Sequence, residues 1–148
     1  MEEDYTSPKN RIAKIEELKN STSQKIASSI NAFGGTVNLI ELLEGDSNDE
    51  FLILNFLPDI PNRPKNDIRQ EETIAIVTSE NKQKLPKVFA MRDDFPLGLP
   101  HTNVTKEERP VSLCIFEEDF EELKHKWSGS YFIQSIKNWL ELTAREEL

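Results

Sequence analysis

Three residues that could take part in covalent catalysis lie within a span of fourteen residues: His101, Asn103 and Cys114. Cys114 is the only cysteine of the chain, and a thiolate is a strong nucleophile towards acyl groups. A histidine, here His101 or His125, can accept the thiol proton, and a side-chain amide can donate a hydrogen bond to an oxyanion. The set therefore suits an enzyme that acts through a thiol, although neither histidine lies in a known protease motif.

The surroundings of Cys114 also suit a structural role. Its neighbours Leu113 and Ile115 are apolar, as expected for a small buried side chain in a strand. From spacing alone, a structural cysteine is favoured over a catalytic one, and both interpretations stay open. Two histidines and one cysteine at these spacings make a poor zinc site, so we expect no metal. Gly34-Gly35 precedes a predicted strand and not a helix, so no phosphate-binding loop and no cofactor are expected.

Length and composition predict one soluble domain. The chain has 148 residues, of which 36% are hydrophobic and 30% charged, so it can bury a core of its own. A single cysteine allows no internal disulfide, and no apolar stretch suits a signal peptide or a membrane span, which together favour the cytoplasm. The net charge of −9 repels phosphate backbones, so nucleic acid is not an expected partner.

Hydrophobic patterns predict the elements that position these residues. A helix is expected from about residue 9 to 32, ended by Gly34-Gly35. Four runs rich in β-forming residues follow, at 36–44, 51–57, 72–79 and 87–92. No helical pattern separates these runs, so they favour a four-stranded antiparallel meander.

The segment after Cys114 is predicted to become helical. Phe116, Phe120 and Leu123 have helical spacing in a short segment that ends near Trp127. A final helix is expected from about Phe132 to Ala144, with Ser128 or Ser130 as its N-cap. The predicted fold class is α+β, with an N-terminal helix, the antiparallel meander, a long irregular segment that carries Cys114, and a C-terminal helix.

This order of features resembles the ubiquitin-conjugating enzyme fold. Members of that family place a His-Pro-Asn motif before an active-site cysteine in a long loop, and Trp-Ser or Trp-Thr after it. The corresponding residues here are Pro86-Lys87-Val88-Phe89 before the loop, His101-Thr102-Asn103, Cys114 and Trp127-Ser128. The stretches DDFPLGLPHTN, RPVSLCIFEEDFEEL and LTARE are similar to bacterial ubiquitin-conjugating-like domains. Those domains occur beside ThiF-type adenylating enzymes and JAB-type peptidases in anti-phage operons, including cyclic-oligonucleotide signalling systems.

The resemblance implies a function and a role for each site residue. Cys114 would accept the C-terminal acyl group of a ubiquitin-like protein or a cyclic-nucleotide synthase from a ThiF-type adenylating enzyme, and pass it to an amine. Asn103 would stabilise the oxyanion or brace the loop. His101 would hold the loop by hydrogen bonding and would not act as the general base. Glu117, Glu118 and Asp119 are expected to complement a helix N-terminus in preference to steering an incoming lysine.

The sequence departs from the family pattern at two points. Thr102 replaces the motif proline, and eleven positions separate Asn103 from Cys114. An alternative interpretation is therefore a catalytically inactive adaptor of the same fold, which docks an adenylating enzyme or a ubiquitin-like partner. We expect residues 1–148 to form a single ubiquitin-conjugating-like domain. Related chains that end like LTAREEL often continue into a ThiF-type domain. We therefore also expect this domain to be the N-terminal part of a longer chain.

Overall fold

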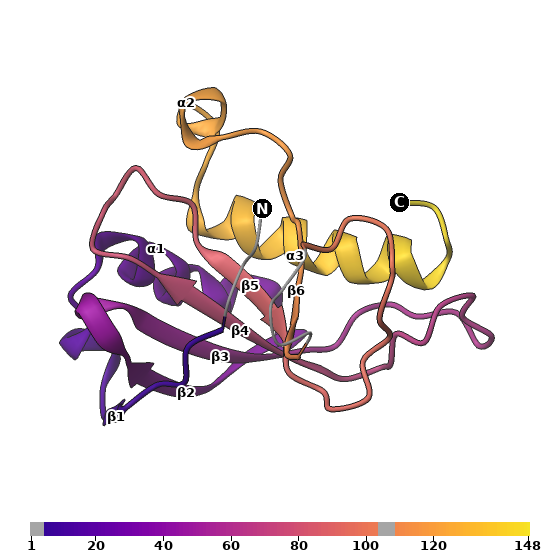
Figure 1. Cartoon of the computed structure of the whole chain (residues 1–148), viewed down its shortest axis with the longest axis horizontal. Helices are drawn as coiled ribbons and strands as arrows, with labels where there is room; N and C mark the ends of the chain where they lie inside the picture. The colour runs from indigo at the N-terminus through magenta and orange to yellow at the C-terminus, as the bar shows by residue number, and fades with distance from the viewer. Residues whose placement is uncertain (1–4, 104–108) are drawn as a thin grey trace.

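A computed structural model describes residues 5–103 and 109–148 of the chain. Its centre is an antiparallel sheet whose strands follow one another in chain order (Figure 1). The six strands are β1 (Asn10–Ile12), β2 (Val37–Glu44), β3 (Glu50–Phe56), β4 (Glu72–Thr78), β5 (Lys87–Ala90) and β6 (Val111–Ser112). Each strand pairs with the next, so the α+β class with an antiparallel sheet is confirmed.

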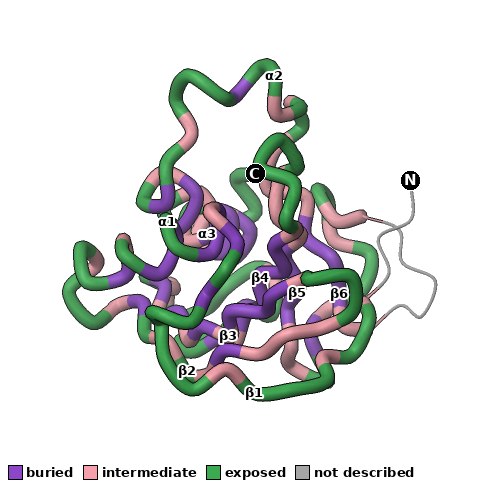
Figure 2. The backbone as a smooth tube through the Cα atoms, turned by 90° about the vertical axis from the view of Figure 1, so that its left-hand side faces the viewer, coloured by how far each residue is buried: buried purple, intermediate pink, exposed green. Residues whose placement is uncertain are grey.

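Two α-helices cover one side of this sheet, α1 (Ser21–Ser29) and α3 (Gly129–Ala144) (Figures 1 and 2). The buried residues of both helices and of the facing strands form one hydrophobic core, which includes Ile26, Leu54, Ile76, Phe132 and Ile136. A third, short helix, α2 (Phe120–Leu123), lies away from the sheet, beyond α3. Because α3 packs on the sheet, it lies close to the segment that carries Cys114.

The prediction of four strands was incomplete. The expected runs correspond to β2, β3, β4 and β5, but β1 and β6 extend the sheet at its two edges. These edge strands have only three and two residues. Two or three residues are too few to show an alternating pattern, so their pairing depends on the strand that lies beside them.

The prediction of a helix from residue 9 was wrong. The first part of that range forms β1 and a 3-10 turn, η1 (Ile15–Glu17), and α1 begins only at Ser21. A buried carboxylate explains this start, because Glu50 accepts hydrogen bonds from the backbone N–H groups of Lys19 (2.8 Å) and Asn20 (3.0 Å). α1 therefore begins directly after two residues whose backbone N–H groups are bound by a strand distant in the sequence, which local periodicity does not reveal.

The end of this helical region and the start of the last helix agree with expectation. After α1 the chain continues as a 3-10 helix, η2 (Ile30–Phe33), and Gly34 ends it in the left-handed conformation (φ 59°). The Ser128 side chain accepts a hydrogen bond from the Tyr131 N–H at 3.0 Å, so Ser128 is the N-cap of α3. A 3-10 turn, η3 (Asp46–Asn48), joins β2 to β3.

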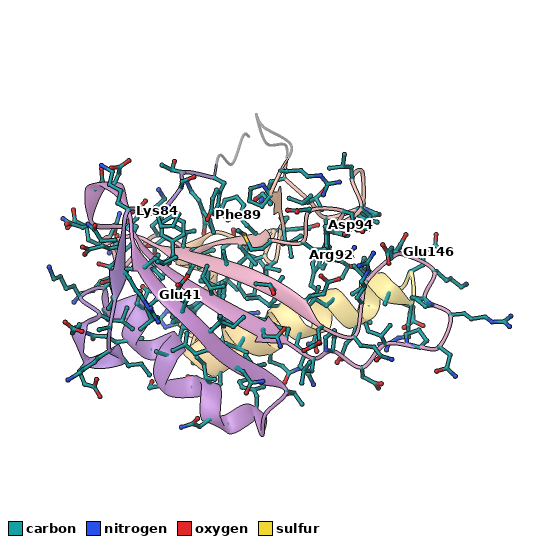
Figure 3. The ribbon with its side chains drawn as sticks, turned by 90° about the horizontal axis from the view of Figure 1, so that it is seen from below. Glu41, Lys84, Phe89, Arg92, Asp94 and Glu146 are labelled. Atoms are coloured by element: carbon teal, nitrogen blue, oxygen red, sulfur yellow. The ribbon has the colours of Figure 1, made fainter. Side chains whose placement is uncertain are left out.

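A buried ion pair connects the residues that follow β5 to the start of β4. The Glu72 carboxylate is fully buried and lies 3.0 Å from the Arg92 guanidinium. Arg92 also binds Asp94 (3.0 Å) and Asp67 (3.2 Å), and Figure 3 shows Arg92 and Asp94 side by side. Desolvation opposes the charge on Arg92, but the hydrogen bonds and charge of Glu72 outweigh it and raise the pKa of Arg92 overall.

The other side of the sheet carries a smaller apolar cluster. Phe51 and Phe89 are buried there, and Tyr5 covers them with edge-to-face contacts at centroid distances of 5.7 and 5.2 Å.

Within the part of the chain that the structure describes, no helix has the length and apolar character that crossing a membrane requires.

Candidate functional site

Asn103 and Cys114 line the same groove, which has a volume of about 380 Å³. The end of the β4–β5 loop and the start of β5 form one wall, and the segment from residue 113 to 119 forms the other. Phe132 of α3 also contributes to the lining. The ten residues between Asn103 and Cys114 in the sequence therefore do not prevent these two residues from lining one groove. Residues 104–108 of that intervening segment lie outside the described residues.

Cys114 is partly buried and lies in irregular chain, two residues after the end of β6. Its thiol is 3.3 Å from the carbonyl oxygen of Phe116, to which it can donate a hydrogen bond. Phe116 stacks on Tyr131 at a centroid distance of 5.7 Å and contacts Phe132 at 5.9 Å, so the residues after the cysteine are anchored to α3. Cys114 therefore borders the groove and is not sealed in the core.

His101 holds the cysteine segment through its backbone. Its carbonyl oxygen accepts two hydrogen bonds, one from the Cys114 N–H at 2.9 Å and one from the Trp139 indole N–H at 3.2 Å. The residue has a φ of 58°, which is unusual for a residue other than glycine. The side chain is 39% exposed, and its Nδ1 lies 3.4 Å from Glu117 Oε1. That the imidazole itself orders the loop stays a prediction.

Asn103 is connected to β6 by two hydrogen bonds. Its backbone N–H donates to the Ser112 carbonyl oxygen at 2.9 Å, and its side-chain Nδ2 donates to Ser112 Oγ at 3.1 Å. Between the two predicted site residues, Thr102 forms a β-bridge with Leu113 and donates its hydroxyl to the Leu99 carbonyl oxygen at 2.8 Å. Thr102 therefore closes the turn by hydrogen bonding, where the family motif has a proline.

The two walls of the groove carry opposite charges. Lys84 and Lys87 belong to the β5 side, and Glu117, Glu118 and Asp119 belong to the other. Asp119 is the N-cap of α2 and forms a capping box with Glu122, as the prediction of an acidic helix start implies. Glu117 and Glu118 have side chains that are 75% and 42% exposed. Glu117 lies 3.4 Å from His101 Nδ1, and Glu118 lies 4.0 Å from Lys126 Nζ.

Sequence reasoning missed Ser112 and Trp139. Ser112 is a common small residue in a two-residue strand, and Trp139 has the spacing of an ordinary core residue of α3. Their contacts with Asn103 and His101 depend on the tertiary structure, so no local signal identifies them. His125 follows α2, is exposed and does not line the groove. Within residues 5–103 and 109–148, no group of three or more His, Cys, Asp or Glu side chains is arranged to hold a metal ion.

Comparison with known proteins identifies the family of the chain. No curated protein and no solved structure matches it. Residues 54–148 match the model of a family described as prokaryotic E2 family A, in which E2 denotes a ubiquitin-conjugating enzyme. The match covers more than half of the chain and includes His101, Asn103 and Cys114. The groove with its partly buried thiol therefore lies within the matched region, and the chain belongs to prokaryotic E2 family A.

Proposed function

We propose that the protein is a ubiquitin-conjugating-like transferase that carries a ubiquitin-like protein, or another protein C-terminus, as a thioester on Cys114. Family membership supports the general class. The single observation that carries the proposal is the position of the Cys114 thiol in irregular chain at the edge of a groove of about 380 Å³. A carrier thiol has to admit an extended C-terminal tail and an attacking amine, and a groove beside the thiol provides room for both.

The reaction proceeds by two acyl transfers. The Cys114 thiol first loses its proton, and its sulfur attacks the thioester presented by the adenylating enzyme. A new carbon–sulfur bond forms, the old one breaks, and the thiolate of that enzyme leaves and takes up a proton. An amine then attacks the thioester on Cys114, the amide bond forms, Cys114 leaves as a thiolate, and the amine nitrogen loses a proton. Each step exchanges one bond at the acyl carbon and needs no further nucleotide.

The acidic wall of the groove favours an amine as the acceptor. Glu117 and Glu118 are accessible and lie on the wall that contains Cys114, so they attract a lysine ammonium group to that side. Asn103 lies in the same groove, where its amide can donate to the oxyanion that forms during the attack. In the resting structure this amide is bonded to Ser112 Oγ, so the same residue also braces the loop.

The proposed partners follow from the resemblance to bacterial ubiquitin-conjugating-like domains. They are a ThiF-type adenylating enzyme as donor and either a ubiquitin-like protein or a cyclic-nucleotide synthase as the carried protein. The proposed setting is bacterial anti-phage defence, in the cytoplasm. A neighbouring gene for an adenylating enzyme would support this setting.

The test is a single-turnover assay with purified adenylating enzyme, ATP and the carried protein, in which loading and discharge to lysine are followed separately. Cys114→Ala should abolish loading, because a thioester requires the sulfur. Cys114→Ser should trap the carried protein as a more stable oxyester. Unchanged loading of Cys114→Ala would contradict the proposal.

The second candidate is an inactive adaptor of the same fold. The observation that favours it is the contact of the Cys114 thiol with the Phe116 carbonyl oxygen, together with carboxylates at the three positions from 117 to 119. Negative charge near a thiol disfavours its ionisation. An adaptor would bind the adenylating enzyme equally well as wild type and as Cys114→Ala, and neither form would acquire a thioester.

A further inference from the structure

We infer that Trp139, in the middle of α3, is a positioning residue for Cys114, an inference that rests on the proposed function for its catalytic consequence. The Trp139 indole N–H and the Cys114 backbone N–H donate to the same acceptor, the His101 carbonyl oxygen, at 3.2 and 2.9 Å. Through this shared oxygen, the last helix holds the backbone of the residue that carries the acyl group.

The shared acceptor belongs to a residue that needs such support. His101 has a φ of 58°, in the left-handed region that residues other than glycine adopt only when their surroundings hold them there. The Cys114 N–H supplies one contact from the neighbouring segment, which itself lies in irregular chain. The indole N–H supplies the second contact from a regular helix, and it is therefore the more rigid of the two donors.

The indole ring is also held by buried aromatic packing. Trp139 is only 3% exposed and stacks on Phe95 at a centroid distance of 6.4 Å with an interplanar angle of 28°. Phe95 is fully buried, and the Arg92 guanidinium lies 5.4 Å from its centroid. Arg92 is held in turn by the buried carboxylate of Glu72. This chain of contacts connects β4 to the His101 carbonyl and leaves the indole little freedom to move.

The backbone N–H groups of Leu113 and Cys114 donate to different parts of the fold. The Leu113 N–H donates to the Val88 carbonyl oxygen of β5 at 2.8 Å, so this residue is held by the sheet. Cys114 is held by His101, and through it by Trp139. A change at the indole should therefore loosen Cys114 and leave Leu113 unaffected. This difference separates a positioning role from a general contribution to stability.

The test uses Trp139→Phe, which removes the indole N–H and keeps an aromatic ring beside Phe95. The matched control is Trp127→Phe, because the Trp127 indole N–H is buried without a hydrogen-bond acceptor in the described part of the structure. Amide hydrogen exchange is measured by NMR for Cys114 and Leu113. In Trp139→Phe we expect the protection of the Cys114 amide to fall about fivefold, as for the loss of one hydrogen bond, with Leu113 unchanged. Trp127→Phe should change neither amide.

The catalytic consequence is measured in the loading assay with purified adenylating enzyme. Trp139→Phe should lower kcat for loading about fivefold and leave KM for the adenylating enzyme unchanged, because it alters the nucleophile and not a docking surface. Equal loss of protection at Cys114 and Leu113, or no loss at either, would overturn the inference. Wild-type protein that acquires no thioester would refute the proposed function, while the exchange data would still decide whether Trp139 holds Cys114.

Discussion

The side-chain amide of Asn103 donates a hydrogen bond of 3.1 Å to Ser112 Oγ, two residues before Cys114. A backbone hydrogen bond of 2.9 Å between the same two residues runs parallel to it. Together these two hydrogen bonds bring Asn103 beside Ser112, although nine positions separate the two residues in the sequence. The same amide is also the proposed oxyanion donor, so it has to leave Ser112 Oγ or share its two hydrogens when the amine attacks.

Asn103→Ala should separate these two roles. We expect it to spare loading, because the thioester arrives activated, and to slow discharge to lysine about a hundredfold, as for the loss of one oxyanion donor. The matched variant is Ser112→Ala, which removes only the acceptor that holds the amide in the resting structure and should leave discharge nearly unchanged. Single-turnover rates for both steps provide the measurement. Equal losses of loading and discharge in Asn103→Ala would show that the residue only braces the loop.

Two substitutions of His101 should isolate the effect of its backbone conformation on stability. Both His101→Ala and His101→Gly remove the ring, but only glycine adopts a φ of 58° without strain. We therefore expect His101→Gly to be more stable than His101→Ala by about 1 kcal/mol in denaturant unfolding at neutral pH. Equal stabilities of the two variants would mean that the conformation at this position is relaxed in the folded protein.

Asp94 should contribute to the loss of stability in acid. The hydrogen bond from Arg92 lowers the pKa of Asp94 below its ordinary value of 3.8, with a further contribution from Arg69. A carboxyl whose pKa is depressed in the folded state stabilises the protein above that ordinary value, and the stabilisation is lost as the pH falls through the depressed pKa. In Asp94→Asn, the free energy of unfolding should therefore decrease less steeply below about pH 4.

The control for this experiment is Asp93→Asn, an exposed neighbour for which no ion pair is found among the described residues. It should keep the wild-type slope of stability against pH. Denaturant unfolding at a series of acidic pH values gives both slopes. Identical slopes for the two variants would show that the Arg92–Asp94 contact does not persist in solution.

Gly129→Ala should destabilise the protein at the contact between its two main helices. A Cβ atom at this position would overlap with the backbone carbonyl oxygen of Lys25 and with Ser29 Oγ in α1. Backbone cannot move aside cheaply, so we expect a loss of about 2–3 kcal/mol in denaturant unfolding. Ser130→Ala, at the exposed next position, should change the stability by less than about 0.5 kcal/mol. A stable Gly129→Ala protein would mean that α1 and α3 can separate without cost.

The predictable part of the fold consists of elements whose evidence is local. β2, β3, β4 and β5 carry continuous runs of β-forming residues, and α3 has both an apolar stripe and an N-cap serine. These signals reside in neighbouring residues, so periodicity and capping rules detect them. The resemblance that connects His101, Asn103 and Cys114 also needs only their order in the chain, and the family match covers all three.

The start of α1 and the two edge strands could not be predicted in this way. The region from residue 9 to 20 has apolar residues at helical spacing, but the buried Glu50 carboxylate binds the N–H groups of Lys19 and Asn20 and places the helix start after them. β6 is a strand only because β5 lies beside it. In both cases the deciding partner is distant in the sequence, and tertiary contact overrides local preference.

The same division holds for the candidate site. Residue types and order alone determined that a thiol, an amide and an imidazole occur together in a ubiquitin-conjugating-like chain. Only the tertiary structure decided that Asn103 and Cys114 line one groove, that Ser112 holds the amide, and that His101 acts on the cysteine segment through its carbonyl oxygen. The physical reason is that hydrogen bonds and burial depend on distances between atoms, and folding sets those distances across segments that share no local pattern.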